Sequence, residues 1–199
     1  MKEIGHIKHV QIQRTCLKIG QKPYRYYDPG ALLVVSSLLL SPRGTIGVTI
    51  DGEHIIDVHH ADHPTSRNQD LNGISIGFTS HYQAMRAQFG QHLVDGIAGE
   101  NILVETDDEQ TLADLEPGVA ILSAETGQMI HLQELLVAAP CVEFSRFAIN
   151  DGMSPPNELI KETLQFLDNG RRGFYATVAE SQEPIAIHAG DRVYVLGTA

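Results

Sequence analysis

Apolar residues in this 199-residue chain gather in short runs, separated by glycine, proline and polar turn residues. Apolar runs of about four to eight residues between turn signals are typical of β-strands. The runs predict strands at residues 6–19, 45–50, 54–58, 102–104, 118–122, 129–132, 135–139, 175–178 and 190–196. The most apolar run, Ala31–Leu40, is interrupted by Ser36 and Ser37 and predicts a buried strand or a short core helix.

Two segments repeat their apolar residues at helical spacing instead. The first, Thr79–Leu93, begins with two residues that are able to cap a helix, and Tyr82, Met85 and Phe89 form its core-facing stripe. The second, Asn157–Leu167, carries a similar apolar stripe and is followed by an Asp-Asn-Gly sequence that closes it. We therefore expect two helices among many strands.

Turn signals complete the prediction of the fold. Asp51-Gly52 lies between two β-rich runs and predicts a hairpin. Residues 107–117 are acidic and predict a solvated loop, and Gly152–Pro156 predicts a break. Because no repeat, linker or low-complexity run divides the chain, we expect one domain over residues 1–199. Many short strands with few helices predict a mainly β fold, a closed or nearly closed β-barrel with a few short helices.

Composition narrows the classes of function. The net charge of −11 argues against a nucleic-acid partner and against an anionic membrane surface, since both need a basic face. It does not exclude a small anionic ligand held by local arginines. The run Ala31–Leu40 is about half as long as a membrane span requires, and the first residues show no cleavable signal pattern. We therefore expect a cytoplasmic protein without a membrane partner.

The chain has two cysteines, Cys16 and Cys141, without the spacing of a disulfide framework or a zinc site. Cys141 directly follows Pro140, which ends an apolar run. Because proline cannot donate to a strand ladder, the cysteine is expected where a strand stops and a turn or short helix begins. Functional side chains collect at such positions, although a free cysteine also serves as a small buried apolar residue. The pattern leaves both alternatives open.

The segment His59–Arg67 is a polar loop with three histidines, a carboxylate and an arginine. Imidazole and carboxylate groups suit zinc, iron or nickel, so a metal site is one interpretation. Adjacent histidines on an extended chain point in different directions, however. We therefore favour a ligand-facing loop that contributes His59 or Arg67.

Glu100 and Asn101 stand between a glycine-rich turn and a predicted strand. Gly96 and Gly99 permit a tight turn or a close approach of the backbone. A buried Glu-Asn pair at the start of a strand is either a structural polar network or part of a ligand cradle. The sequence does not decide between them.

Four segments together carry a resemblance to a known family. Gly96–Ile102 reads GIAGENI, Pro140-Cys141 follows an apolar strand, Gly170–Tyr175 reads GRRGFY, and Gly190–Val193 reads GDRV. In this order and rough spacing they resemble the MOSC domain, which is named for the C-terminal domain of molybdenum cofactor sulfurases. The resemblance covers residues 44–196, and residues 1–43 match the family poorly.

The resemblance implies a MOSC-type barrel in which Cys141 faces a pocket for the molybdenum cofactor, a pterin. In some relatives this cysteine is a molybdenum ligand, and in others it is thought to carry sulfur toward the cofactor. Both roles need a thiolate, which a positive neighbour would favour. The candidate cofactor-binding residues are His59, Arg67, Glu100, Asn101, Arg146, Arg171 and Arg172. The arginines suit the cofactor's phosphate, and Asn101 suits a hydrogen bond to the pterin, whereas each arginine is equally explained as a solvated or salt-bridged side chain.

Three functions follow from the resemblance. As an enzyme, the protein would reduce N-hydroxylated substrates with Cys141 as molybdenum ligand. Its electrons would come from a separate reductase, because no cysteine set for an iron–sulfur cluster is present. As a carrier, it would hold sulfur as a Cys141 persulfide, supplied by a pyridoxal-phosphate-dependent cysteine desulfurase, or hold the cofactor itself. The third alternative is a barrel that has kept the fold without the ligand.

Overall fold

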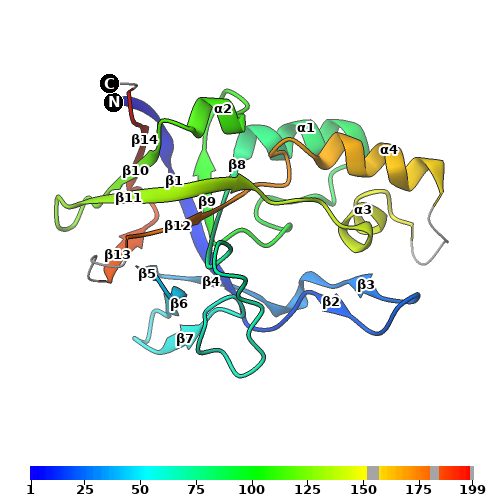
Figure 1. The fold of residues 1–199 in the computed structure, drawn as a ribbon, viewed down its shortest axis with the longest axis horizontal. Coiled ribbons are helices and arrows are strands. Elements are labelled where there is room, and N and C mark those ends of the chain that lie inside the picture. Colours follow the sequence, from blue (N-terminus) through cyan, green and yellow to red (C-terminus); the bar gives the residue numbers. More distant parts are fainter. Residues whose placement is uncertain (152–156, 180–183, 198–199) are drawn as a thin grey trace.

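A computed structural model of the protein describes residues 1–151, 157–179 and 184–197, and its centre is a β-barrel (Figure 1). Within these residues, seven strands close into a ring in the order β14-β10-β11-β12-β8-β9-β1, since β1 also pairs with β14. Their bounds are β1 Lys2–Gln13, β8 Ile74–Phe78, β9 Ile102–Glu105, β10 Val119–Leu122, β11 Met129–Val137, β12 Phe174–Thr177 and β14 Arg192–Val195. The predicted mainly β barrel is confirmed, whereas the predicted break at Gly152–Pro156 lies outside the described residues.

The long strand β1 closes the barrel. It pairs with β14 near the N-terminus and with β9 along its middle, and its last residues pair with β4 (Leu32–Val35). Register shifts near Gly5 and between Ile7 and His9 bend the strand, as β-bulges do. Within the barrel only β8 and β9 run parallel, and helix α1 makes the crossover between them. The N-terminal residues are thus a structural part of the barrel, although the family motifs lie further along the chain.

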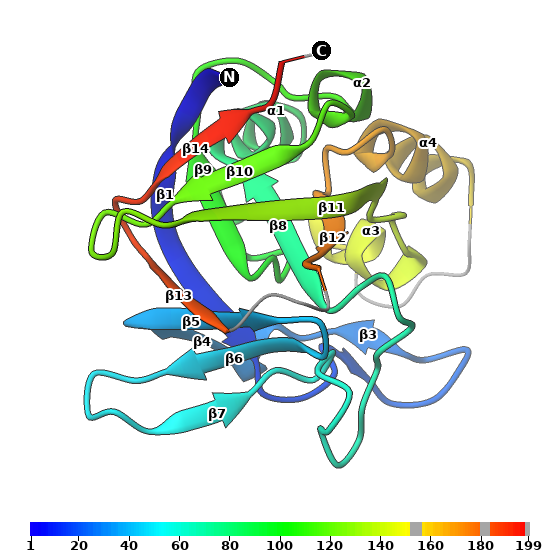
Figure 2. The ribbon, with the colours of Figure 1, turned by 60° about the vertical axis from the view of Figure 1, so that its left-hand side comes forward.

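A second sheet lies under the barrel (Figure 2). Its order is β13-β5-β6-β7, with bounds Ile185–His188, Ser37–Ser41, Gly44–Val48 and His54–Ile56. The hairpin at Asp51-Gly52 is confirmed, since β6 and β7 pair antiparallel and Gly52 has a φ of 81°. The run Ala31–Leu40 is neither one strand nor a helix but two strands, β4 and β5, separated at Ser36. Strand β13 was not predicted.

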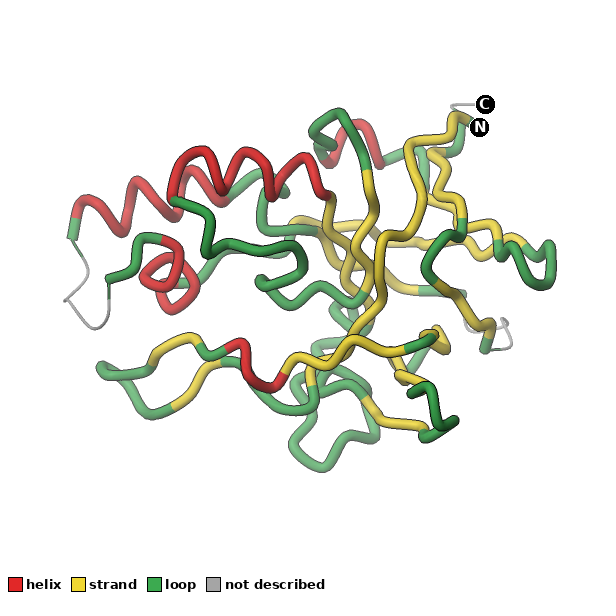
Figure 3. Tube along the Cα trace, turned by 180° about the vertical axis from the view of Figure 1, so that it is seen from behind, coloured by secondary structure: helices red, strands yellow, loops and turns green. Residues whose placement is uncertain are grey.

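The helices gather on one side of the strands, as seen from behind in Figure 3. They are α1 Thr79–Phe89, α2 Leu112–Leu115, α3 Val142–Ala148 and α4 Glu158–Leu167. A two-stranded hairpin of β2 (Lys18–Ile19) and β3 (Tyr26–Tyr27), followed by the 3-10 turn η1 (Pro29–Ala31), extends on the same side. No helix of the described residues is long and apolar enough to cross a membrane.

Three details of the predicted helices need correction. The acidic segment 107–117 is not all loop, because Thr111 and Asp114 form a capping box that starts α2. Neither Thr79 nor the next residue caps α1; the Thr79 hydroxyl donates to the Thr106 carbonyl instead. Helix α4 is confirmed with Asn157 as its cap, but Leu159, expected on its apolar stripe, is exposed.

Two apolar clusters hold the fold together. The first fills the barrel, where Ile7, Ile76 and Phe174 are fully buried. The second lies between the barrel and the helices and includes Tyr82, Met85, Leu93, Phe144 and Leu167. Tyr27 of the β2–β3 hairpin belongs to this second cluster, and its ring meets Phe144 edge-on at 5.0 Å. This packing holds the hairpin against α3, and the hairpin forms one wall of the candidate site.

Candidate functional site

A cavity of about 440 Å³ lies where the end of β1, the β2–β3 hairpin, the His59–Arg67 loop and the start of β12 meet. We call it the polar cavity. Its cationic or ionisable side chains are Cys16, Lys18, Arg25, Tyr27, His59, Arg67, Arg172 and Tyr175. The structure therefore brings three of the predicted residues together, His59, Arg67 and Arg172, beside cations that the sequence did not single out.

Backbone hydrogen bonds hold the walls of this cavity. The amide of Val58 donates to the Gln13 carbonyl at the end of β1, and the amide of Arg67 donates to the Val58 carbonyl. These bonds fold the loop of residues 59–67 back on itself, so that both His59 and Arg67 line the polar cavity. On the opposite wall, the Tyr27 hydroxyl donates to the Ile97 carbonyl at 2.7 Å.

His59 is oriented by a fully buried carboxylate. Oδ1 of Asp57 accepts the His59 amide at 2.8 Å and lies 3.1 Å from the ring nitrogen Nδ1. Its other oxygen accepts from the Gln13 amide at 2.7 Å and from the Asn101 side chain at 3.0 Å. With both oxygens held, Asp57 fixes the imidazole at the edge of the polar cavity.

The same network explains Asn101. Its side-chain oxygen accepts from the amide and hydroxyl of Ser75, and its NH₂ group donates to Asp57 and to the Gln11 carbonyl. These four bonds use the full capacity of the amide. Of the two alternatives left open by the sequence, the structural polar network describes Asn101, and no bond remains for a ligand.

Glu100 lies behind Arg172 rather than in the cavity. It is fully buried, and its Oε2 accepts from the Tyr82 hydroxyl at 2.7 Å, while Oε1 has no partner among the described residues. Burial raises the pKa of Glu100, and the nearby charge of Arg172 opposes that rise. Glu100 therefore affects the polar cavity indirectly, through its charge interaction with Arg172.

Arg172 connects the polar cavity to the cysteine. Its guanidinium donates to the Ala98 carbonyl at 2.9 Å and lies 5.9 Å from the ring centre of Phe144. Burial lowers the pKa of Arg172, but the ionisable groups around it, Tyr175, Tyr27, Glu100 and Cys141, raise it more. Arg172 is therefore a permanent cation within electrostatic range of the thiol.

The structure places Arg171 away from the polar cavity. Its guanidinium pairs with Glu109 at 3.3 Å, donates to the Phe166 carbonyl and lies 4.5 Å from the centre of the Phe166 ring. It lines none of the cavities described here. The alternative of a salt-bridged side chain describes this arginine, whereas its neighbour Arg172 points to the cavity.

Cys141 lies at the predicted junction of strand and helix. Strand β11 ends at Val137 and α3 begins at Val142, with the half-buried Cys141 as the residue that precedes the helix. Its surroundings form a second cavity of about 500 Å³, which we call the thiol cavity. This cavity is lined by Lys22, Pro23, Arg25, Pro140, Cys141, Val142, Glu143, Arg146 and Leu164. Arg25 lines both cavities, so the thiol is a neighbour of the polar cavity and not inside it.

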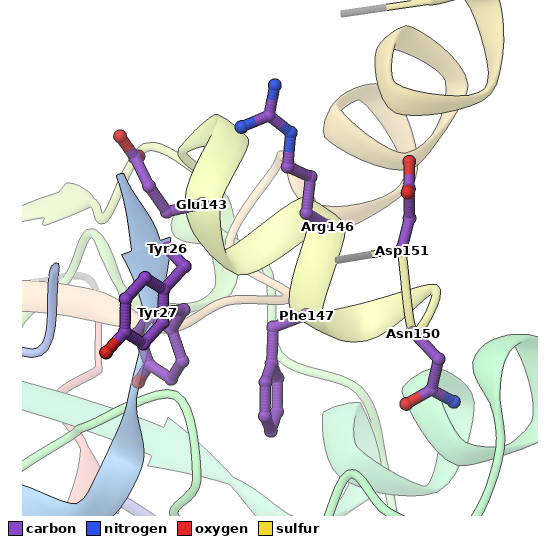
Figure 4. Close-up of a pocket in the computed structure, with 7 residues that line it drawn as sticks. All are labelled: Tyr26, Tyr27, Glu143, Arg146, Phe147, Asn150 and Asp151. Atoms are coloured by element: carbon purple, nitrogen blue, oxygen red, sulfur yellow. The ribbon is translucent and has the colours of Figure 1, made fainter. Parts of the chain in front are cut away.

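A third hollow of about 410 Å³ adjoins the other two, and we call it the aromatic pocket (Figure 4). It is lined by Tyr26, Tyr27, Glu143, Arg146, Phe147, Asn150 and Asp151. Tyr27 is shared with the polar cavity, and Glu143 and Arg146 are shared with the thiol cavity. Arg146, predicted as a phosphate ligand, therefore lines the thiol cavity and the aromatic pocket but not the polar cavity.

The metal interpretation of the His59–Arg67 loop finds no support. The described residues contain no group of three His, Cys, Asp or Glu side chains arranged to hold a metal ion. His60 and His63 instead accept hydrogen bonds from backbone amides of their own loop, those of Asp62 and Thr65. The histidines separate because each stabilises a turn, and only His59 faces the polar cavity.

Comparison with known proteins identifies the family. The sequence profile of the MOSC domain matches residues 69–194. The chain belongs to the MOSC domain family. No curated protein sequence matches this MOSC protein.

Solved structures agree on the fold. The protein is similar to the YUAD protein from Bacillus subtilis, with a TM-score of 0.56 and 14% identity over 95% of this chain and 93% of the other. It is also similar to a hypothetical protein, with a TM-score of 0.52 and 13% identity over 98% of this chain and 70% of the other. At these identities the likeness extends to the fold alone, and it includes the N-terminal residues that the family profile leaves out.

The profile begins after most of the residues that line the polar cavity. The residues before 69 include Lys18, Arg25 and Tyr27, which line the cavity, and Asp57, which orients His59. None of the four was predicted as a site residue from the sequence. Only Asp57 had a local signal, because a carboxylate two residues before a histidine at the end of a strand is able to close a turn onto it. The other three reach the site through the hairpin, which no short-range pattern predicted.

Proposed function

We propose that this MOSC protein binds the molybdenum cofactor, with the cofactor's phosphate in the polar cavity and the Cys141 thiol as the protein's ligand to molybdenum. The observation that carries the proposal is the cluster of Lys18, Arg25, Arg67 and Arg172 around one cavity, next to a cysteine, in a chain with a net charge of −11. Because the chain as a whole repels anions, a local cluster of cations favours an anionic ligand at that place.

The donor set fits the cofactor in two respects. Arginine presents a planar fork that matches phosphate oxygens, and the polar cavity offers three arginines from different segments. A thiolate is a soft ligand of the kind that suits molybdenum, and Cys141 is a free, half-buried thiol beside this cavity. Arg67 and Lys18 would hold the phosphate, and Arg172 would face both the cofactor and the thiol.

We propose that the reaction is the reduction of N-hydroxylated substrates. When bound, the cofactor supplies a metal centre able to pass electrons to a substrate. The electrons come from a separate reductase, since a chain with two cysteines lacks the ligands of an iron–sulfur cluster. The Nδ1–H of His59 donates to the Asp57 carboxylate, so the other ring nitrogen, Nε2, would be a proton acceptor beside the bound cofactor.

A second candidate uses the same thiol as a sulfur carrier. It is favoured by the position of Cys141, which is half-exposed in a cavity of its own beside the polar cavity. A cysteine desulfurase would transfer one sulfur atom from its own persulfide to the thiolate of Cys141. Mass spectrometry after incubation with such an enzyme tests this candidate, because a persulfide adds about 32 Da to the chain. No adduct on Cys141 would eliminate it.

The cofactor proposal is tested with matched arginine variants. Arg67→Gln removes an exposed cation from the polar cavity, and Arg171→Gln removes one outside it. After purification from a host that makes the cofactor, we expect wild type and Arg171→Gln to retain equal amounts of pterin, measured by fluorescence of the oxidised form. Arg67→Gln should retain on the order of a tenth of this amount, as expected for loss of one charge-assisted contact. Equal retention by all three proteins would contradict a phosphate site in this cavity.

A further inference from the structure

The aromatic pocket contains a cation that forms no ion pair with any other residue that the structure describes. Arg146 is only 6% exposed, and its Nε has no hydrogen-bond partner among the described residues. None of the ion pairs between described residues includes it. A buried guanidinium without partners is costly, so buried arginines are normally paired. Arg146 is therefore available to an anionic group.

The nearest acidic side chain on the same helix is already occupied. Glu143 receives both Nε and an NH₂ group of Arg25 at 2.5 Å, so its charge is matched from the hairpin and not by Arg146. Asp151, at the other end of the pocket, has a carboxylate that lies beyond 4 Å from the Arg146 guanidinium, since no ion pair forms between them. Asp151 therefore leaves the Arg146 guanidinium available, but the negative charge of Asp151 opposes the binding of a ligand with several negative charges.

Aromatic rings supply the rest of the pocket. The ring centres of Phe147 and Tyr27 lie 5.3 Å apart, and the partly exposed ring of Tyr26 lines the same pocket. In Figure 4 the two tyrosine rings stand together on β3, while the Phe147 ring and the Arg146 side chain leave α3 in opposite directions, toward two ends of the pocket. The volume of about 410 Å³ falls within the range of about 300 to 1,000 Å³ that small-molecule sites occupy. Ring faces of this kind bind a flat apolar body.

We propose that the aromatic pocket binds a small planar aromatic compound with a single acidic group, such as a carboxylate, which pairs with Arg146. The ring of this compound lies against Tyr26 and Phe147. Since Glu143 and Arg146 also line the thiol cavity, the bound compound is the next neighbour of Cys141. A role of this compound as substrate rests on the proposed function. Its binding in the aromatic pocket does not depend on the cofactor.

The binding test uses the cofactor-free protein and two probes that differ only in charge, indole-3-carboxylate and indole-3-carboxamide, in titration calorimetry. We expect the carboxylate to bind, and the carboxamide to bind at least about tenfold more weakly because it lacks the charge-assisted contact. Arg146→Gln should lose a similar factor for the carboxylate and leave the carboxamide unchanged. Arg171→Gln, which removes an arginine outside the pocket, should bind as the wild type does. Arg146→Lys, which keeps the charge, should recover part of the loss and excludes a general disturbance of α3.

Equal affinity for the two probes, or equal carboxylate affinity of wild type and Arg146→Gln, would overturn the proposal, as would no binding by the wild type. The cofactor measurement is independent of this result. Aromatic-acid binding in a protein that holds no pterin would retain the pocket and refute the proposed function. Pterin in a protein that does not bind the aromatic acid would refute the aromatic-acid proposal and leave the proposed function in place.

Discussion

Arg25 on the β2–β3 hairpin forms an ion pair with Glu143 on α3, with 2.5 Å between the guanidinium and Oε1. Arg25 lines the polar and thiol cavities, and Glu143 lines the thiol cavity and the aromatic pocket. The pair thus stands where the three hollows adjoin. It also ties the hairpin to the helix that begins directly after Cys141, so the shape of the whole site depends on it.

Breaking this ion pair should lower the free energy of unfolding by an amount that depends on pH. Burial raises the pKa of Glu143, but the hydrogen bond and charge of Arg25 lower it more, to below its usual value of 4.5. A carboxyl with a lower pKa in the folded state stabilises the fold above its unfolded pKa and loses that contribution as the pH falls. Glu143→Gln should therefore reduce the free energy of unfolding by about 1 to 3 kcal/mol at pH 7.

Urea denaturation at pH 7 and at pH values below 4.5 measures this difference. The difference in the free energy of unfolding between wild type and Glu143→Gln should narrow as the pH falls and the wild-type carboxylate takes up its proton. Lys161 and Glu158 form an exposed pair on α4, and Glu158→Gln serves as the control, with a change of less than about 0.5 kcal/mol. A gap that stays constant with pH would contradict the assigned role of Arg25.

Asn101 should behave as a structural residue. Asn101→Ala removes four hydrogen bonds and leaves the buried Asp57 carboxylate and the Ser75 amide with one partner fewer each. We expect a loss of about 2 to 4 kcal/mol in the free energy of unfolding, measured in urea. Gln128→Ala, at an exposed amide whose side chain forms no hydrogen bond with the described residues, is the control. If Asn101→Ala unfolded like the wild type and lost only pterin, the residue would be a ligand after all.

The turn before β12 requires glycine at residue 173. Gly173 has a φ of 111°, and a methyl group there would lie 2.9 Å from the Ile76 carbonyl oxygen and 3.1 Å from the side chain of Glu100. Gly127 also has a positive φ, 71°, but nothing lies within 4 Å of its would-be methyl group. Both alanine variants should bear the backbone strain of about 1 kcal/mol, and Gly173→Ala should lose at least about 2 kcal/mol more through the clash.

Thermal unfolding of the two glycine variants separates strain from packing. Equal melting temperatures would mean that the strand ends and Glu100 move aside without cost. The expected lower value for Gly173→Ala would show that Glu100 is held rigidly beneath Arg172.

Local patterns predicted much of the fold. The alternation and turn chemistry around Asp51-Gly52 are enough to specify a hairpin, and the apolar stripe of Asn157–Leu167 is enough to specify α4. The strand predicted at residues 6–19 is divided in the structure, since β1 ends at Gln13 and Lys18–Ile19 form β2. Strand β3 has two residues and is held by packing of Tyr27 against Phe144, so its own sequence carries no strand signal. Helix α2 was missed because its four residues depend on a capping box in an acidic segment.

The site was harder to predict than the fold. Motif reasoning located Cys141 and Arg172, which lie in local sequence signatures. Arg25 could not be found in this way, since its partner Glu143 is 118 positions away and the two meet only when the hairpin folds onto α3. Asn101 stands in the strongest motif, yet the sequence does not tell whether its amide serves a ligand or Asp57. Only the three-dimensional network decides that.

The most direct test of the account is the content of molybdenum and pterin per chain, in protein purified from a host that makes the cofactor. We predict molybdenum close to one atom per chain in the wild type and its loss in Cys141→Ser, with Arg171→Gln, which lies outside the cavities, as the control that retains it. Pterin should fall less than molybdenum in Cys141→Ser, because the cations of the polar cavity remain. Neither molybdenum nor pterin in the wild type would contradict the account and leave a MOSC barrel without this ligand.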